Sequence, residues 1–282
     1  MTMSVDFAFI DSGTGGLPYM KYLTEKYLES SCIYVADAKN FPYGEKTSEQ
    51  VISCAKDLCA KVIKNFNPKV IVIACNTISV TALKELRSTF SLPFIGTVPA
   101  IKLAASITQN KKIGLLATER SVNSDYTAQL IKDFASDCKV FSRPDGQLIN
   151  FIERNLTSTD KLSRTNACRP AVEFFTDNDV DTIILGCTHF IHFSNEIQSL
   201  ATELAKEKNL SHSVQVIDSR DGVVRQALKM RGTVKASTVN DEELKPRYEN
   251  CTFFVTGYPP YTSEKDYKKI ATSMNIPWGG LI

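Results

Sequence analysis

The sequence lacks several features that would assign it to a specialised class of protein. It has no apolar run of about 18 residues, the length that a membrane-spanning helix needs, so we expect no membrane partner. Its 33 basic and 31 acidic residues give a formal net charge of +2, too small an excess to indicate a nucleic-acid partner. The first residues do not show the basic stretch and long apolar stretch of a signal peptide. We therefore expect a cytoplasmic protein.

Sequence motifs for metals and cofactors are also missing. No two of the eight cysteines have the C-x-x-C spacing of a structural zinc site, and in the cytoplasm we expect them to be reduced thiols. Gly13, Gly15 and Gly16 follow a predicted strand, but their spacing does not match the G-x-G-x-x-G pattern of dinucleotide sites. No motif indicates a lysine that binds pyridoxal phosphate. The sequence therefore predicts chemistry that needs neither a cofactor nor a metal.

Two short apolar runs each end in a cysteine that is followed by small polar residues. They are IVIACNT at 71–77 and IILGCTH at 183–189. Such runs, bounded by helical patterns, are typical of buried parallel strands. Ligands of open α/β sheets bind beyond the carboxyl ends of the strands, so we expect Cys75 and Cys187 to take part in chemistry there. The alternative, that each is a packed apolar thiol, is weakened by the matching contexts.

The order of strand and helix patterns predicts an α/β fold with parallel sheets. The pattern restarts near residue 112, and each half places a turn after its first strand and a cysteine after a later one, at a similar separation. We interpret this as two related α/β lobes with pseudo-twofold symmetry and an active site in the cleft between them. We expect residues 1–98 and 212–282 to form the first lobe, and residues 99–211 the second. Residues 233–250 are charged and are predicted to be irregular.

Five motifs, in this order, resemble those of the glutamate racemase family: DSGTGGL at 11–17, PYGEKT at 42–47, ACNT at 74–77, LGCTH at 185–189 and IDS at 217–219. The resemblance spans nearly the whole chain, and the first two motifs favour glutamate racemases over aspartate and hydantoin racemases. It implies a cofactor-independent interconversion of L- and D-glutamate that supplies D-glutamate for peptidoglycan synthesis. It also implies a homodimer. One departure is Ser121, which stands where the family usually has threonine.

The resemblance implies roles for five catalytic residues. Cys75 takes the Cα proton from D-glutamate and Cys187 takes it from L-glutamate. Asp11 assists Cys75, while His189 assists Cys187 together with Glu153. Helpers are needed because a free thiol titrates at about 8.5. From the residues alone, Glu153 fits equally well as a solvated carboxylate on a helix, and Asp11 could be a turn former.

The two carboxylates of the substrate need polar anchors, yet no arginine lies within the strongest motifs. Hydroxyl and amide side chains on turns that precede helices are the candidates, because helix N-termini attract anions. We expect Tyr43 and Gly44 to close the site from a loop. The substrate-binding residues implied by the resemblance are Asp11, Ser12, Tyr43, Gly44, Asn76, Thr77, Ser121, Thr188 and His189.

Three other functions fit part of the pattern. A related racemase that acts on aspartate would use the same two thiols. A hydrolase with Cys187 as nucleophile and His189 as base would leave Cys75 and Asp11 without a role. A non-enzymatic binder of an anionic amino acid would explain the hydroxyl groups but not the paired thiols. Solvent-deuterium exchange at the Cα of glutamate would separate an enzyme from a binder.

Overall fold

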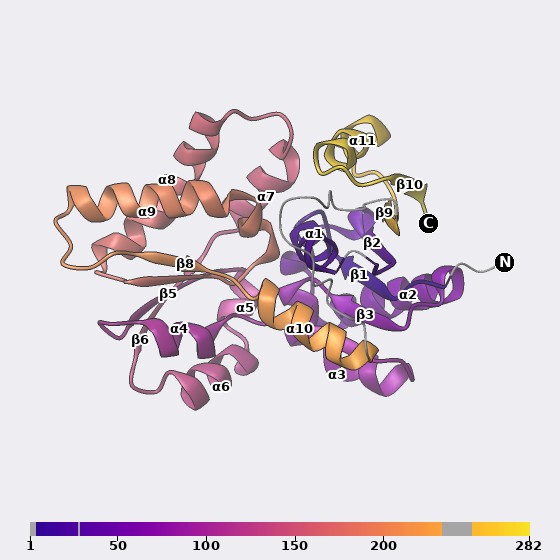
Figure 1. Ribbon diagram of the computed structural model, residues 1–282, viewed down its shortest axis with the longest axis horizontal. Helices are drawn as coiled ribbons and strands as arrows, with labels where there is room; N and C mark the ends of the chain where they lie inside the picture. Colours follow the sequence, from indigo (N-terminus) through magenta and orange to yellow (C-terminus); the bar gives the residue numbers. More distant parts are fainter. Residues whose placement is uncertain (1–3, 28, 233–249) are drawn as a thin grey trace. The chain divides into compact units, whose positions relative to one another are not determined.

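The computed structural model describes residues 4–27, 29–232 and 250–282. The chain divides into two compact units, one formed by residues 1–97 and 220–282 and the other by residues 98–219. Each unit is built on its own parallel sheet (Figure 1). The predicted α/β class with two parallel sheets is confirmed. The segment predicted to be irregular, residues 233–250, lies outside the described residues except for its last residue.

The sheet of the first unit has its described strands in the order β10-β9-β2-β1-β3-β4, and every neighbouring pair is parallel. The strands are β1 (Phe7–Asp11), β2 (Cys32–Ala36), β3 (Val70–Ile73), β4 (Phe94–Gly96), β9 (Cys251–Val255) and β10 (Trp278–Leu281). The first three are buried along their whole length, as their continuous apolar runs predict. The sequence did not indicate β10, because two of its four residues are glycines.

The helices of the first unit are α1 (Leu17–Lys26), α2 (Ser48–Phe66), α3 (Asn76–Thr89), α10 (Arg220–Arg231) and α11 (Glu264–Ser273), with the short turns η1 (Ala38–Asn40) and η2 (Tyr43–Glu45). Of these helices, α2 and α3 pack apolar side chains against this sheet in one core cluster. Helix α2 begins at a capping box, in which the Gln50 N–H donates to Thr47 Oγ1 and the Thr47 N–H donates to Gln50 Oε1. It ends at Phe66, with Asn67 as the C-cap residue directly before Pro68.

The sheet of the second unit has its described strands in the order β6-β5-β7-β8, again with parallel neighbours only. The strands are β5 (Lys112–Ala117), β6 (Lys139–Pro144), β7 (Thr182–Leu185) and β8 (Gln215–Ile217). The helices are α4 (Ile101–Ile107), α5 (Glu119–Val122), α6 (Asp125–Phe134), α7 (Gly146–Asn155), α8 (Lys161–Asp177) and α9 (Ser194–Glu207), with the short turn η3 (Thr188–Phe193). Strands β5 and β7 therefore lie in the middle of this sheet.

One expected boundary differs from the structure. We expected the chain to return to the first lobe at residue 212, but β8 pairs with β7 and belongs to the second unit, which extends to Ser219. The pairing that extends the second unit places Thr182 opposite Gln215 and Ile184 opposite Ile217. A short strand of mixed burial gave no signal in the sequence that could assign it to one sheet or the other.

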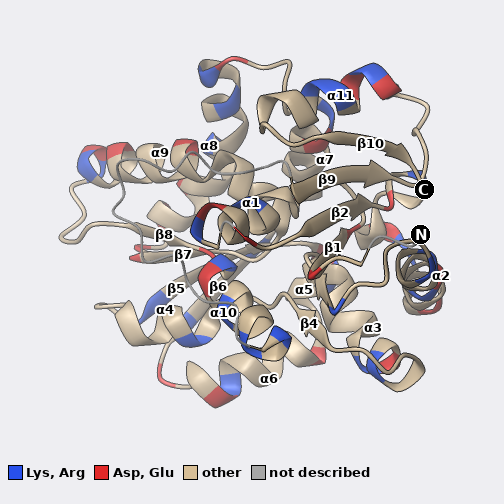
Figure 2. Ribbon diagram, turned by 45° about the vertical axis from the view of Figure 1, so that its right-hand side comes forward, with Lys and Arg blue, Asp and Glu red and all other residues tan. Residues whose placement is uncertain are grey.

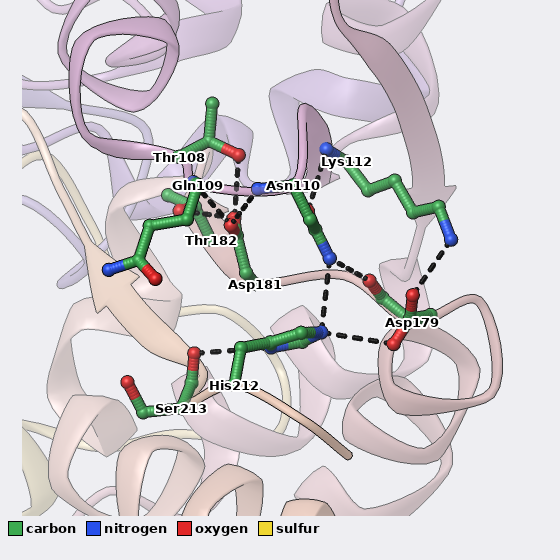
Figure 3. A network of polar contacts seen from close by, with 9 residues as sticks. All are labelled: Thr108, Gln109, Asn110, Lys112, Asp179, Asp181, Thr182, His212 and Ser213. Atoms are coloured by element: carbon green, nitrogen blue, oxygen red, sulfur yellow. Dashed lines mark hydrogen bonds and ion pairs between the residues drawn. The ribbon is translucent and has the colours of Figure 1, made fainter.

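The amino end of the second sheet is fixed by the buried carboxylate of Asp181 (Figure 3). It accepts hydrogen bonds from the backbone N–H groups of Gln109 and Asn110 at 2.6 and 2.8 Å. The hydroxyl groups of Thr108 and Thr182 donate to the same carboxylate at 2.7 and 2.8 Å. This network ties the turn before β5 to the start of β7, at the end of β7 opposite to Cys187.

Charged residues of both signs occur on the helix α11, where Figure 2 shows Lys next to Asp and Glu along the ribbon. On α11, the Lys268 ammonium pairs with Glu264 one turn earlier, at 2.8 Å. In the described part of the chain, no helix combines the length and the apolar character that crossing a membrane requires.

Candidate active site

Cys75 stands where the strand β3 gives way to the helix α3. Its backbone is still extended, with φ −145° and ψ 117°, and it is the N-cap residue of α3. The neighbouring strand β1 is parallel, so its carboxyl end lies at the same edge of the sheet. The side chain of Cys75 is only 5 % exposed and belongs to the apolar cluster of the first unit. This is the strand-end position that the sequence predicted.

Asp11 and Ser12 follow β1 and reach Cys75 from the neighbouring strand. The Ser12 N–H and hydroxyl group both donate to Asp11 Oδ1, at 2.6 and 3.2 Å. Ser12 Oγ lies 3.9 Å from Cys75 Sγ, within reach of a weak hydrogen bond to sulfur. Asp11 is fully buried. The structure thus connects the Asp11 carboxylate to the Cys75 thiol through the Ser12 hydroxyl group.

Tyr34, which the sequence analysis did not single out, holds the turn that carries Asp11. Its hydroxyl group donates to the Gly13 carbonyl at 2.7 Å and lies 3.4 Å from Asp11 Oδ2. The same oxygen accepts the Gly16 N–H at 3.0 Å. Because Tyr34 lies in the middle of a buried strand, its sequence context is that of any core aromatic residue. No sequence signal could have separated it from the core.

Asn76 and Thr77 form the first turn of α3, directly after Cys75, and both are buried. Among the described residues, neither the amide nitrogen nor the amide oxygen of Asn76 has a hydrogen-bond partner. An unpaired buried amide costs about 1–3 kcal/mol, so such a group normally has a partner outside the protein chain. Asn76 is therefore suited to bind a polar ligand next to Cys75.

Tyr43 and Gly44 lie in the turn η2, which contacts α3. Tyr43 is buried in the same apolar cluster as Cys75, and its hydroxyl group donates to the Asp37 carboxylate. Burial and the nearby Asp37 carboxylate raise the pKa of Tyr43 above its ordinary value, so the phenol stays protonated. The loop is thus fixed against the Cys75 side of the first unit.

In the second unit, Cys187, His189 and Glu153 form a continuous chain of contacts. Cys187 follows β7, is 5 % exposed and has extended backbone angles. Its Sγ lies 3.8 Å from His189 Nδ1, and His189 Nε2 lies 2.8 Å from Glu153 Oε2. Glu153 is buried on α7, which packs against η3. The interpretation of Glu153 as a solvated carboxylate is therefore wrong.

The surroundings of His189 favour its protonated form. Burial alone would lower the pKa of the imidazole, but hydrogen bonds to Cys187 and Glu153 and the negative charges of these groups outweigh it. The pKa of His189 is thereby held well above its ordinary value. A protonated imidazole next to a thiol stabilises the thiolate. The pair is suited to proton transfer at Cys187.

Thr188 and Ser121 supply hydroxyl groups in the second unit. Thr188 is buried next to Cys187, at the start of η3. Ser121 is buried on α5, after the central strand β5, and its hydroxyl group accepts a hydrogen bond from Thr118 at 2.8 Å. The N–H of Ser121 donates to the same Thr118 oxygen at 3.1 Å. Thr118 therefore orients Ser121.

Cys59 and His212, which lie outside the candidate site, have surroundings that suit structural roles. Cys59 is buried in the apolar cluster of the first unit, and burial raises its pKa to about 12. His212 lies at the amino end of the second sheet, with Nε2 3.0 Å from both Asn110 and Asp179 (Figure 3). Among the residues that the structure describes, no group of three or more His, Cys, Asp and Glu side chains is arranged to hold a metal ion.

Comparison with known proteins identifies the family. The model of the Asp/Glu/Hydantoin racemase family matches residues 19–227, which is more than half of the chain. The chain belongs to this family. A glutamate racemase of Treponema pallidum (strain Nichols) is 36 % identical over 276 residues, which cover 98 % of this chain and 96 % of that protein. A glutamate racemase of Shewanella (strain ANA-3) is 31 % identical over 96 % of this chain and 93 % of its own length.

Solved structures of the family have the same fold. The Escherichia coli glutamate racemase, in complex with L-glutamate and the activator UDP-MurNAc-Ala, matches 99 % of this chain and 98 % of its own, with a TM-score of 0.80 and 25 % identity. A glutamate racemase isoform of Bacillus anthracis matches 100 % of this chain and 98 % of its own, with a TM-score of 0.77 and 26 % identity. The resemblance seen in the five motifs is thereby confirmed.

Proposed function

We propose that this protein interconverts L- and D-glutamate by removing the Cα proton with one cysteine and returning a proton with the other. The main observation in support is that Cys75 and Cys187 each follow an interior strand of a separate parallel sheet. Cys187 lies next to His189, and Cys75 is connected to the Asp11 carboxylate through Ser12. The curated relatives, at 31–36 % identity over nearly the full length, are glutamate racemases, which favours glutamate over aspartate as substrate.

The reaction needs one cysteine as a thiolate and the other as a protonated thiol, because one removes a proton and the other supplies one. In the direction from L to D, the Cys187 thiolate takes the Cα proton, and the carbanion that remains takes a proton from the Cys75 thiol on the opposite face. The reverse direction exchanges these roles. His189, hydrogen-bonded to Glu153, stabilises the thiolate of Cys187. Asp11 assists Cys75 through Ser12.

The substrate-binding part of the proposal rests on buried polar groups near each thiol. Asn76 has a buried amide with no partner among the described residues, which makes it the best-supported anchor for a carboxylate or amino group. The helix α3 begins at this point, and the N-terminus of a helix attracts anions. Ser12, Thr77, Tyr43 and Gly44 complete the Cys75 side. On the Cys187 side, the binding groups are those of Ser121, Thr188 and His189.

The proposal places the protein in the supply of D-glutamate for peptidoglycan, which follows from glutamate racemisation. We also propose that it works in the cytoplasm, where thiols stay reduced, and all eight of its cysteines are free.

We propose a homodimer as its assembly. Light scattering after size-exclusion chromatography tests this, because a dimer has twice the 31.3 kDa mass of one chain.

A Cys–His hydrolase remains the alternative with a specific observation in its favour. Cys187, His189 and Glu153 form a hydrogen-bonded series of the kind that activates a nucleophile. This alternative gives Cys75 no role, although Ser12 connects Cys75 to a buried carboxylate. Equal dependence of activity on both thiols would exclude it.

The test uses two variants and a glutamate analogue with a leaving group on Cβ. Elimination from such an analogue needs only proton abstraction, so one thiolate suffices. We expect Cys75→Ser and Cys187→Ser each to lose nearly all racemisation, because a serine hydroxyl is too weakly acidic to act as the second base. Cys187→Ser should still eliminate from the D-analogue, and Cys75→Ser should still eliminate from the L-analogue.

Two outcomes contradict the proposal. If both variants eliminate from the same enantiomer, the two thiols do not act on opposite faces of Cα. If either variant keeps full racemisation, that cysteine is a packed thiol without a catalytic role. Circular dichroism of glutamate measures racemisation, and the keto acid formed after elimination can be followed with a coupled dehydrogenase.

A further inference from the structure

The strand β9 belongs to a part of the chain outside residues 19–227, the range matched by the family model, yet it reaches the loop that carries Tyr43. β9 pairs with β2 in a register that places Val255 opposite Ala36. The next residue, Thr256, donates its N–H to the Ala36 carbonyl at 3.0 Å. Thr256 is thereby fixed next to Asp37, the first residue after β2.

Asp37 is a buried carboxylate with hydrogen bonds from separate parts of the first unit. The Thr256 hydroxyl group donates to Oδ1 at 2.6 Å. The Asn40 side-chain amide donates to Oδ1 and Oδ2 at 3.2 and 3.0 Å. The Tyr43 hydroxyl group donates to Oδ2. One carboxylate thus joins the end of β9 to both short turns of the loop between β2 and α2.

Thr256 makes a second contact with the same loop. Its oxygen accepts the backbone N–H of Lys39 at 3.3 Å. Directly after it, Gly257 packs so closely that a Cβ at this position would lie 3.1 Å from Lys39 Cβ. The hydroxyl group therefore bridges a backbone donor of η1 and the carboxylate that holds Tyr43.

We infer that Thr256 and Asp37 are positioning residues that hold Tyr43 against the Cys75 side of the site. Neither needs to touch the substrate, because both act through the Tyr43 hydroxyl group and the backbone of the loop. The inference rests on the proposed function, in which Tyr43 and Gly44 bind glutamate next to Cys75. It extends that function to the C-terminal segment, which contributes to substrate binding through one threonine.

Thr256→Val tests the inference, because valine keeps the shape of threonine and removes the hydroxyl group. We expect the KM for glutamate to rise about three- to tenfold, the effect of losing one hydrogen bond of ordinary strength, because Thr256 acts on the substrate only through the loop, with a smaller change in kcat. Thr256→Ser keeps the hydroxyl group and should restore the KM. Thr252→Val is the matched control on the same strand, because no hydrogen bond of the Thr252 side chain is seen among the described residues.

A second readout does not depend on activity. Hydrogen exchange of the loop amides at 38–46, followed by mass spectrometry, should be faster in Thr256→Val than in Thr252→Val, since the Lys39 N–H loses its acceptor. Tyr43→Phe should raise the KM by itself. Combined with Thr256→Val, it should raise the KM by less than the product of the two single effects, because both changes act on one network.

The outcomes separate this inference from the proposed function. If the unaltered protein racemises glutamate but Thr256→Val keeps its KM, the inference is wrong and the proposed function stands. Loop exchange equal to that of the Thr252→Val control would also overturn it. If the unaltered protein does not racemise glutamate, the proposed function fails, and the role of Thr256 in that reaction fails with it.

Discussion

At the scale of the residue, His189 has the charge state that the structure specifies most clearly. Its pKa is raised above the ordinary value, so over part of the pH range the folded protein holds a proton here that the unfolded chain has released. The stabilisation is fully present below the unfolded pKa of about 6.5 and is lost as the pH rises through the folded pKa. The His189–Glu153 pair should therefore stabilise the fold most at mildly acidic pH.

Replacement of His189 by asparagine measures this contribution. The difference in unfolding free energy between the unaltered protein and His189→Asn should shrink as the pH rises above about 6.5, by at most about 1.4 kcal/mol per pH unit. Urea unfolding at a series of pH values provides the free energies. A difference that stays constant or grows with pH would show that His189 is not protonated in the folded protein.

Single residues also show which parts of the site a sequence can reveal. Cys75 and Cys187 could be predicted because a strand end is a local pattern of apolar and small polar residues. The position of Glu153 could not, because its burial depends on the packing of α7 against η3, far away in the sequence. The role of Tyr34 could not be predicted either, because its hydroxyl group donates to the carbonyl of Gly13, about twenty residues earlier in the chain.

At the scale of the element, close packing explains the last glycine of the turn after β1. Gly16 is the N-cap residue of α1, and a Cβ at this position would lie 2.6 Å from both the Cβ and the carbonyl oxygen of Ala74. The sequence could not show this approach, because Ala74 is 58 positions away in the chain. The glycine allows α1 to begin directly against the residue before Cys75.

Gly16→Ala should therefore destabilise the protein. Because backbone atoms as well as a side chain lie in the way, we expect a loss of about 1–3 kcal/mol of unfolding free energy, together with reduced racemisation. Gly146→Ala is the control, because a Cβ there meets no atom within 4 Å and alanine is favoured over glycine in a helix. Equal stability of the two variants in chemical denaturation would contradict this account.

At the scale of the whole molecule, the first unit must join residues 1–97 to residues 220–282. The Asp6 carboxylate contributes to this connection, with Lys69 Nζ at 3.0 Å and Arg231 Nε at 2.7 Å. Burial opposes its ionisation, but the hydrogen bonds from Lys69 and Arg231 outweigh it and lower the pKa of Asp6 to about 2. The sequence could not show this pairing, since its partners come from distant segments.

Asp6→Asn should cost about 1–2 kcal/mol of unfolding free energy at neutral pH, reduced from the full pKa shift because Lys69 is half exposed. A lowered pKa stabilises the fold above the unfolded value of 3.8, and this gain is lost as the pH falls towards about 2. The two proteins should therefore converge in stability at acidic pH. A difference that persists at pH 2 would mean that the charge of Asp6 is not the cause.

Two short strands of the molecule, β8 and β10, could not be assigned from the sequence. The alternation of strands and helices predicted both parallel sheets. It did not place β8, because three residues of mixed burial could extend either sheet. Strand β10 was not predicted for a similar reason. Its two glycines have low strand propensity, and the strand is defined by its pairing with β9. Short edge strands are defined by their neighbours more than by their own residues.

The central claim is proton exchange at the Cα of glutamate by two thiols, and one measurement tests it most directly. Purified protein is incubated with L-glutamate in deuterium oxide, with a chelator present and no cofactor added. We predict that the circular dichroism of glutamate falls to zero and that the D-glutamate formed carries deuterium at Cα. An unchanged dichroism signal with the Cα proton retained would contradict the claim.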